Sequence, residues 1–288
     1  GSDITRIGSG LTFSLSLPLL AAEVGIAQVG IAFEKEITKM VTQVGLGRQQ
    51  VNSFANSILE LGPALGALPV EAAQAFFVIT SAGIRTSREA LETFTTSAKA
   101  TAIGLGEMRD IARLTTGAVQ SYGSSILSST RAVEILLSTV REGNFEAEKL
   151  APTLGHLTGL AAELGVKFEE VGAFIATFTI TGVPVEVAVT SLRSVLNSII
   201  DPTDKAIDVL ERYNLTIQDV RDSIADPNRG LSATLAFLRE NMRTTDLAEL
   251  SGSIRGLAGL LAVTGDLKDS FLSIRNTILQ SQGILYKA

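Results

Sequence analysis

Cysteine and tryptophan are absent from the 288-residue sequence, and histidine occurs once, at His156. Without cysteine the chain can form no disulfide and can offer no thiolate to a metal ion. One histidine cannot supply a histidine-based metal site or a catalytic triad that needs a second base. His156 lies between apolar neighbours in Leu154-Gly-His-Leu157, a setting typical of a histidine that hydrogen-bonds within a helix. These absences exclude disulfides and thiolate metal sites and argue against histidine-based catalysis.

Other patterns that carry chemistry are also missing. The sequence has no Gly-x-x-x-x-Gly-Lys phosphate loop, and Gly8-Ser-Gly10 and Gly104-Leu-Gly106 are two-glycine fragments outside any strand-to-helix context. No calcium loop with alternating aspartates is present. Close carboxylate pairs do occur, and we expect them at helix N-termini, where they offset the helix dipole, or on exposed faces: Glu34/Glu36, Glu146/Glu148 and Glu169/Glu170. The sequence therefore predicts no catalytic residue, no cofactor and no metal site.

Aromatic residues make up only 5% of the chain, whereas apolar residues make up 45% and the mean hydropathy is +0.32. The core must therefore be built from Ala, Leu, Ile and Val, whose small side chains let helices approach closely. The formal net charge is −6, and the basic residues are scattered without a run of three, so specific nucleic-acid binding is not expected. A chain this apolar and this poor in chemistry is expected to work through its surfaces, by assembling, and not as an enzyme.

Helical periodicity runs almost from end to end, as in Ile37, Met40, Val41 and Val44, which follow i, i+3, i+4, i+7 spacing. Thr86-Ser-Arg-Glu89 and Asp246-Leu-Ala-Glu249 are typical of capping boxes. The expected helices span 18–45, 47–61, 69–82, 86–103, 106–122, 125–142, 146–164, 168–181, 184–200, 202–213, 230–243, 246–264 and 266–286. The sequence thus predicts an all-α fold, a compact multi-helix bundle of roughly a dozen short to medium helices.

An internal repeat is predicted by two segments that align without gaps. Leu65–Ile84 and Leu164–Val183 lie 99 residues apart and share Leu, Gly, Glu, Thr and a final Gly at equivalent positions. Those final glycines, Gly83 and Gly182, are expected to adopt the positive φ that ends a helix. We interpret the pair as a duplicated helical hairpin.

One stretch has the length of a membrane span. Leu11–Phe33 contains a single charge, Glu23, but Pro18 interrupts it and no basic region of a signal peptide precedes it. We therefore expect a helix that is buried or faces a partner, with insertion into a host membrane as a further role. The apolar side chains expected to form this face are Leu19, Leu20, Val24, Ile26, Val29, Ile31 and Phe33.

The most polar part of the chain is Asp201–Gly230, which carries Pro202 and Pro227. It is the best candidate boundary between a main helical bundle at 1–200 and a smaller C-terminal helical part at 201–288. Because the sequence starts at Gly1 without an initiator methionine, we expect it to be a fragment of a longer protein.

Several short segments, taken in their order along nearly the whole chain, resemble the core-region family of phage tail tape-measure proteins. At Thr181 the sequence departs from the alanine usual before the turn glycine. The segments that carry the resemblance are Ile7-Gly-Ser-Gly-Leu11, Leu15-Ser-Leu-Pro-Leu19, Phe33-Glu34, Val70-Glu-Ala-Ala-Gln74, Ser81-Ala-Gly-Ile84, Leu150-Ala-Pro-Thr-Leu154, Ala161-Ala-Glu-Leu-Gly-Val166, Phe168-Glu-Glu-Val171, Thr181-Gly-Val183, Thr190-Ser-Leu-Arg-Ser-Val195, Ile254-Arg-Gly-Leu-Ala-Gly-Leu-Leu261 and Thr264-Gly265.

The resemblance implies a structural virion protein that acts in tail assembly, length control and genome ejection. Family members lie in the lumen of the tail tube or at the tail tip and reach the host cell envelope on ejection. The implied partners are other copies of the chain, as a homo-oligomer such as a trimer, together with tail tube and tail tip proteins and the host membrane. Two alternatives remain open at this stage: a helical pore-forming or membrane-inserting module, and a helical scaffold or adaptor.

Overall fold

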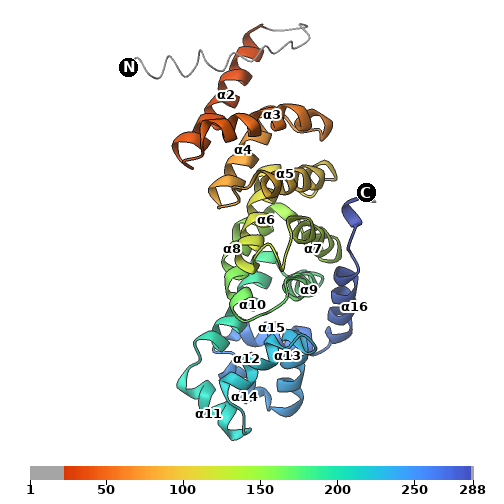
Figure 1. Cartoon of the computed structure of the whole chain (residues 1–288). Coiled ribbons are helices and arrows are strands. Elements are labelled where there is room, and N and C mark those ends of the chain that lie inside the picture. Colours follow the sequence, from red (N-terminus) through yellow and green to blue (C-terminus); the bar gives the residue numbers. More distant parts are fainter. Residues whose placement is uncertain (1–22, 287–288) are drawn as a thin grey trace.

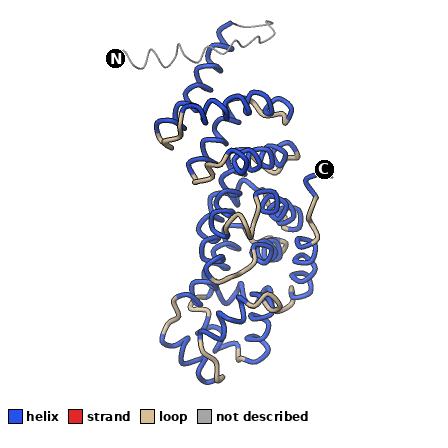
Figure 2. Tube along the Cα trace, in the orientation of Figure 1, coloured by secondary structure: helices blue, strands red, loops and turns tan. Residues whose placement is uncertain are grey.

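The computed structural model describes residues 23–286 of the chain. Over this range it consists of α-helices and one short 3-10 helix, without a β-strand (Figure 2). The predicted all-α fold is confirmed. The described elements are α2 (Glu23–Thr42), α3 (Arg48–Ala64), α4 (Pro69–Ser81), α5 (Ser87–Ala102), α6 (Met108–Tyr122), α7 (Ser129–Glu142), α8 (Ala147–Glu163), α9 (Phe168–Thr179), α10 (Val185–Ile200), α11 (Asp204–Arg212), α12 (Ile217–Ala225), α13 (Gly230–Asn241), α14 (Thr244–Leu250), α15 (Ile254–Thr264), α16 (Lys268–Leu279) and η1 (Ile284–Tyr286).

Helix ends follow local sequence signals in most places. Thr86 is the N-cap of α5, and its hydroxyl accepts a hydrogen bond from the Glu89 N–H, which confirms the N-cap of the predicted capping box; the Glu89 carboxylate accepts from the Thr86 hydroxyl. Pro69 occupies the first turn of α4, where a missing N–H costs nothing. The predicted capping box at Asp246 is wrong, because α14 begins at Thr244 and places Asp246 inside the helix. The helix expected at 246–264 is divided into α14 and α15, and α12 was not predicted.

The helices stack in two layers that form an elongated array (Figure 1). In the first layer α2, α4, α6, α8, α10 and α15 pack in succession, each against the next. In the second layer α3, α5, α7, α9 and α16 do the same. We call these two layers the stack. Because consecutive helices from α2 to α10 alternate between the layers, each turn reverses the chain and buries one apolar stripe per helix.

The two turn glycines predicted from the repeat both follow a helix and have positive φ, 100° at Gly83 and 85° at Gly182. After Gly83 the N–H of Ile84 donates to the carbonyl of Ile79, which satisfies a carbonyl at the end of α4. A side chain at either position would strain the backbone, since L-residues rarely adopt this conformation.

The predicted duplication agrees with the helix boundaries of the structure but not with the positions of the helices in the two layers. The segments α3, α4 and α5 match α8, α9 and α10 at the same 99-residue spacing, to within one or two residues at each bound. However, α4 lies in the first layer between α2 and α6, whereas α9 lies in the second layer between α7 and α16. The two copies therefore occupy different layers, and the duplication stays a prediction.

One continuous apolar core runs along the stack from Phe33 to Ile278. At one end the rings of Phe54, Phe76 and Phe94 form a row, with centroids 5.3 and 4.7 Å apart, that joins α3, α4 and α5. Towards the other end α15 packs on α10, and α16 packs on α9 and α7. The elements after residue 200 thus share the core of the elements before it, while the proposed division into two parts stays a prediction.

Candidate interlock site

The described residues hold no group of three or more His, Cys, Asp or Glu side chains that could bind a metal ion. One cleft among them is an open surface depression lined by the charged residues Lys205, Asp208, Glu211, Arg212 and Glu249. The most organised polar groups are instead buried between helices. They lie where α9, α7 and the C-terminal helices meet, and we call this region the interlock.

The interlock is centred on Glu169 and Glu170 in the first turn of α9, where the helix dipole favours carboxylates. The two side chains contact different helices. The carboxylate of Glu169 faces Arg131 on α7, and that of Glu170 faces α13 and α16. This pair was predicted at a helix N-terminus or on an exposed face. Both residues do lie at the helix N-terminus, but Glu170 is only 1% exposed.

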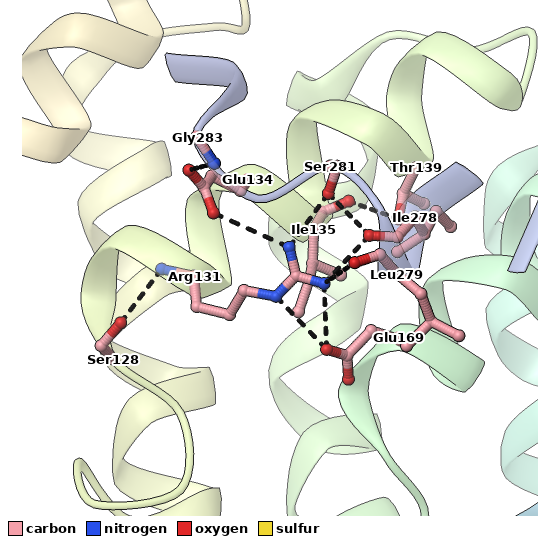
Figure 3. Close-up of polar contacts among 10 residues, drawn as sticks. All are labelled: Ser128, Arg131, Glu134, Ile135, Thr139, Glu169, Ile278, Leu279, Ser281 and Gly283. Atoms are coloured by element: carbon pink, nitrogen blue, oxygen red, sulfur yellow. Dashed lines mark hydrogen bonds and ion pairs between the residues drawn. The ribbon is translucent and has the colours of Figure 1, made fainter. Parts of the chain in front are cut away.

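Arg131 joins α7 to the end of α16 (Figure 3). Its Nη2 donates to the carbonyls of Ile278 at 3.0 Å and Leu279 at 3.2 Å, and its Nη1 donates to the Ser281 hydroxyl at 3.1 Å. The same guanidinium lies 3.1 Å from the Glu169 carboxylate. The last carbonyls of a helix have no partner within the helix, so the guanidinium acts as the C-terminal cap of α16.

Glu134, one turn after Arg131 on α7, is 2% exposed. Its carboxylate accepts a hydrogen bond from the backbone N–H of Gly283 at 2.6 Å and lies 3.7 Å from Nη1 of Arg131 (Figure 3). A buried carboxylate is tolerated only when its charge is compensated and its oxygens are hydrogen-bonded. The segment after α16 therefore contributes directly to the compensation of this charge.

Glu170 caps a helix that lies 60 residues further along the chain. Its oxygens accept hydrogen bonds from the N–H groups of Leu231 at 2.9 Å and Ser232 at 3.2 Å, and from the Ser232 hydroxyl at 2.8 Å. These donors lie in the first turn of α13, where backbone N–H groups have no partner within the helix. Arg275 on α16 approaches the same carboxylate at 3.6 Å. One side chain thus connects α9, α13 and α16.

Tyr122 lies at the edge of the interlock, where its hydroxyl donates to the carbonyl of Val166 at 2.9 Å. Burial raises the pKa of this phenol above its ordinary value, and the negative charges of Glu169 and Glu170 raise it further. The group therefore stays neutral and acts as a hydrogen-bond donor that positions the turn before α9.

A second polar cluster surrounds Asp246. Its carboxylate accepts hydrogen bonds from the Tyr213 hydroxyl at 2.6 Å and from Nε of Arg243 at 2.8 Å, and Nη1 of Arg212 lies 3.1 Å away. The hydrogen bonds from Arg243 and then from Tyr213 are the main causes that hold the pKa of Asp246 below its ordinary value. This cluster joins α14 to the end of α11.

The apolar residues predicted to face a membrane or a partner fall in three settings. Leu19 and Leu20 lie outside the described residues, and the side chains of Val24 and Ile26 are not described. Val29 and Ile31 on α2 are exposed, at 48% and 68%. Phe33 is buried in the core of the chain itself, so it does not belong to an outward-facing apolar surface. None of the described helices has the length and hydropathy needed to cross a bilayer.

Sequence reasoning did not find Arg131, Glu134 or Arg275. Arg131 and Glu134 are three residues apart, but their contacts with the C-terminal segment, like that of Arg275 with Glu170, join residues more than 100 positions apart. Glu169 and Glu170 carried one local signal, because two adjacent acidic residues just before an apolar helix are typical of a first turn.

Comparison with known proteins places this all-helical chain in a family of tail proteins. The family described as phage-related minor tail protein matches residues 55–259, so the chain belongs to that family and is a structural protein of the phage tail. The resemblance to tape-measure proteins is thereby confirmed. No solved structure matches.

Two similar proteins are named as tape-measure proteins. The tape measure protein of Pneumococcus phage Dp-1 is 22% identical over 290 residues, covering 98% of this chain and 25% of that protein. The probable tape measure protein of Clostridium phage phiCD119 is 25% identical over 169 residues, covering 58% of this chain and 18% of that protein. The chain therefore spans about a quarter or less of the length of the relatives it matches.

Proposed function

We propose that this chain is the folded core module of a tape-measure protein, acting in tail assembly, in the control of tail length and in genome ejection, and that it is not an enzyme. The observation that carries the proposal is the match of a tail protein family to residues 55–259, together with relatives named as tape-measure proteins. Membership of a structural family also supports the absence of enzymatic activity.

We further propose that the length-measuring part of the protein lies outside this module. An α-helix rises about 1.5 Å per residue, so a long ruler needs an extended helix. The longest described helix, α2, has 20 residues and would span only about 30 Å. The helices from α3 to α10 fold back on one another in the stack, and α11 to α14 pack against one another and against α15. A module of this compact form is better suited to act as a body of fixed shape, at the tail tip or in the tube lumen, than to measure tail length.

The proposed partners are other copies of the chain, as a homo-oligomer such as a trimer, and the proteins of the tail tube and tail tip. Support comes from α2, where Val29 and Ile31 are exposed beyond the part that packs on α3 and α4. Val29 and Ile31 are two positions apart on the helix, so they expose apolar atoms on different sides of this end of α2.

Contact with the host envelope after ejection is a separate proposal that rests on the apolar stretch 11–33. The measurement that tests it is the binding of a peptide covering this stretch to liposomes with bacterial lipid composition. Co-sedimentation with the liposomes is expected, and a peptide that stays in the supernatant would remove this role. Dye leakage caused by the 288-residue chain, with no association with virions, would instead favour a pore-forming module.

The proposed tail function is tested by deleting residues 60–200 in frame from the parent gene and imaging the particles by negative-stain electron microscopy. Missing tails, or tails of normal length that fail to infect, are expected for an assembly or ejection module. Tails shortened in proportion to the deleted residues would make the module part of the ruler. Normal infectious particles would contradict a role in the tail.

A further inference from the structure

The last described segment of the chain runs back over the second layer of the stack. We call residues 268–286, which comprise α16, the following turn and η1, the strap. Helix α16 packs against α9 and then α7, and η1 contacts α5. The strap therefore crosses three successive helices of one layer in the direction opposite to their order in the chain (Figure 1).

The strap is the least embedded part of that layer. Only three residues of the 12-residue α16 are buried, namely Phe271, Ile274 and Ile278. By contrast, α9 has the same length and buries eleven of its residues. Free energies of local opening scale with the apolar contacts that must be broken, so α16 should open at lower cost than α9.

Two small anchors hold the far end of the strap. Leu285 inserts into an apolar cluster that is separate from the main core and is formed by Leu105, Ile111, Val133 and Leu137, among others. Just before it, the Gly283 N–H binds the Glu134 carboxylate. Neither anchor connects the strap to the continuous core, so both can be lost without disturbing it.

At the end of α16 and in the turn after it, most polar contacts are made to Arg131 of the stack, whereas Arg275 and Lys268 earlier in α16 pair with Glu170 and Glu240. Arg131 binds the Ile278 and Leu279 carbonyls and the Ser281 hydroxyl, while its own counter-charges, Glu134 and Glu169, both belong to the stack (Figure 3). When the strap leaves, Arg131 keeps its two carboxylates, and water can replace the three strap oxygens. Release therefore leaves Arg131 paired, and it separates Arg275 from Glu170, whose carboxylate keeps the N–H donors of α13.

We propose that the strap is a releasable clasp, latched by Arg131, that opens while the helices α3 to α10 stay folded. In its closed state the strap holds α5, α7 and α9 in register. In its open state it uncovers the apolar contact between α7 and α9 around Gly172, where Ile278 packs against both helices. The module thus has two states that differ in the exposure of one defined surface.

Hydrogen–deuterium exchange of the 288-residue chain, read by mass spectrometry with and without low denaturant, tests this proposal. Peptides from the strap are expected to exchange at least about tenfold faster than peptides from α9, with a weaker dependence on denaturant, because their opening exposes less surface. Equal rates with equal denaturant dependence would mean that the strap opens only when the whole chain unfolds, and this would overturn the proposal.

The latch is tested by Arg131→Gln, with Arg221→Gln as the matched control. Arg221 caps a helix in the same way, since its guanidinium binds the carbonyls of Ile199 and Ile200 at the end of α10. Loss of charge-assisted hydrogen bonds by Arg131→Gln should speed exchange of the strap about tenfold or more, and much more than exchange of α9, which loses only the ion pair of Glu169. Arg221→Gln should leave the strap unchanged.

An unchanged strap in Arg131→Gln, or equal acceleration of the strap and α9, would overturn the role of Arg131 as a latch. Should Arg131→Gln fail to fold, Leu285→Ala provides the second variant, because it removes only the apolar anchor. Leu285→Ala should speed exchange of the strap alone, and unchanged exchange there would count against the clasp.

Discussion

Glu170 on α9 and Gly230 at the start of α13 approach so closely that a Cβ atom at position 230 would lie 2.7 Å from Oε2 of Glu170. The glycine also has a φ of 73°. Position 230 thus needs glycine for two reasons, a backbone conformation that L-residues avoid and the space taken by a buried carboxylate. This pair fixes where the C-terminal helices join the stack.

Gly230→Ala should therefore destabilise the chain by about 3 kcal/mol or more, since strain at positive φ adds to the displacement of the Glu170 cap. Gly66→Ala is the matched control, because Gly66 has nearly the same φ, 72°, and a Cβ at position 66 would meet no atom within 4 Å. The control should lose only about 1 to 2 kcal/mol. Urea unfolding measures both, and equal losses would mean that the approach of Glu170 has no energetic effect.

Removing the charge of Glu170 tests the interlock itself. Glu170→Gln should cost about 2 to 4 kcal/mol, because the variant loses the ion pair with Arg275 and turns an amide donor towards backbone N–H groups. Glu186→Gln is the control, since Glu186 lies in the first turn of α10 but is exposed. That change should stay within about 0.5 kcal/mol in urea unfolding. Similar effects of the two substitutions would contradict a special role for Glu170.

Gly172 lies at a close contact between α7 and α9. A Cβ atom at this position would overlap with Oγ1 of Thr139. Gly172→Ala should lower the thermal midpoint through a loss of about 1 to 3 kcal/mol, and Thr139→Ala should recover part of that loss by removing the overlapping oxygen. Gly155→Ala on α8 meets no atom within 4 Å and should be neutral or stabilising by up to about 1 kcal/mol. Additive effects of the Gly172 and Thr139 substitutions would contradict the contact.

The cluster around Asp246 predicts a pH dependence. The folded state lowers the pKa of this carboxyl below its ordinary value of 3.8, so the unfolded chain binds the proton more tightly. The stabilisation is therefore present in full above the ordinary pKa and is lost as the pH falls through the lowered value. Thermal unfolding of the parent chain and of Asp246→Asn should differ most above about pH 5 and converge in stronger acid. A difference that stays constant over this range would rule out the carboxylate as its source.

The exposed face of α2 predicts self-association. Ile31→Asp places a charge on a residue that is 68% exposed, so it should leave folding intact and weaken an oligomer formed through α2. Val187→Asp on α10 is the control at an exposed apolar residue elsewhere. Sedimentation velocity should show smaller species for Ile31→Asp alone. The same distribution for both variants would place the contact between copies on another surface.

The helices could be predicted from sequence because their signals are local. Thr86 with Glu89, Pro69 and Gly83 mark helix ends within a few residues of the features they control. The short helix α12 escaped prediction, since its capping box pairs Thr216 with Asp219 where glutamate or glutamine is the usual partner.

The interlock could not be predicted, because its contacts are set by how the helices stack. Nothing near Arg131 in the sequence indicates that it caps a helix ending 148 residues later. At Asp246 the sequence did contain a local signal, the pattern of a capping box, but the prediction was wrong. The Asp246 carboxylate instead accepts hydrogen bonds from Tyr213 and Arg243 and caps no helix. Apolar stripes predict that helices pack, but the order of helices within each layer depends on the whole chain.

We infer that this module acts in the tail through its folded shape and not through its number of residues. The direct measurement is the tail length and infectivity of particles whose parent gene carries Glu170→Gln together with Gly172→Leu, a pair chosen to unfold the module without shortening the chain. The account predicts missing tails, or tails of unchanged length that fail to infect. Infectious particles with normal tails, despite an unfolded module confirmed by proteolysis, would contradict it.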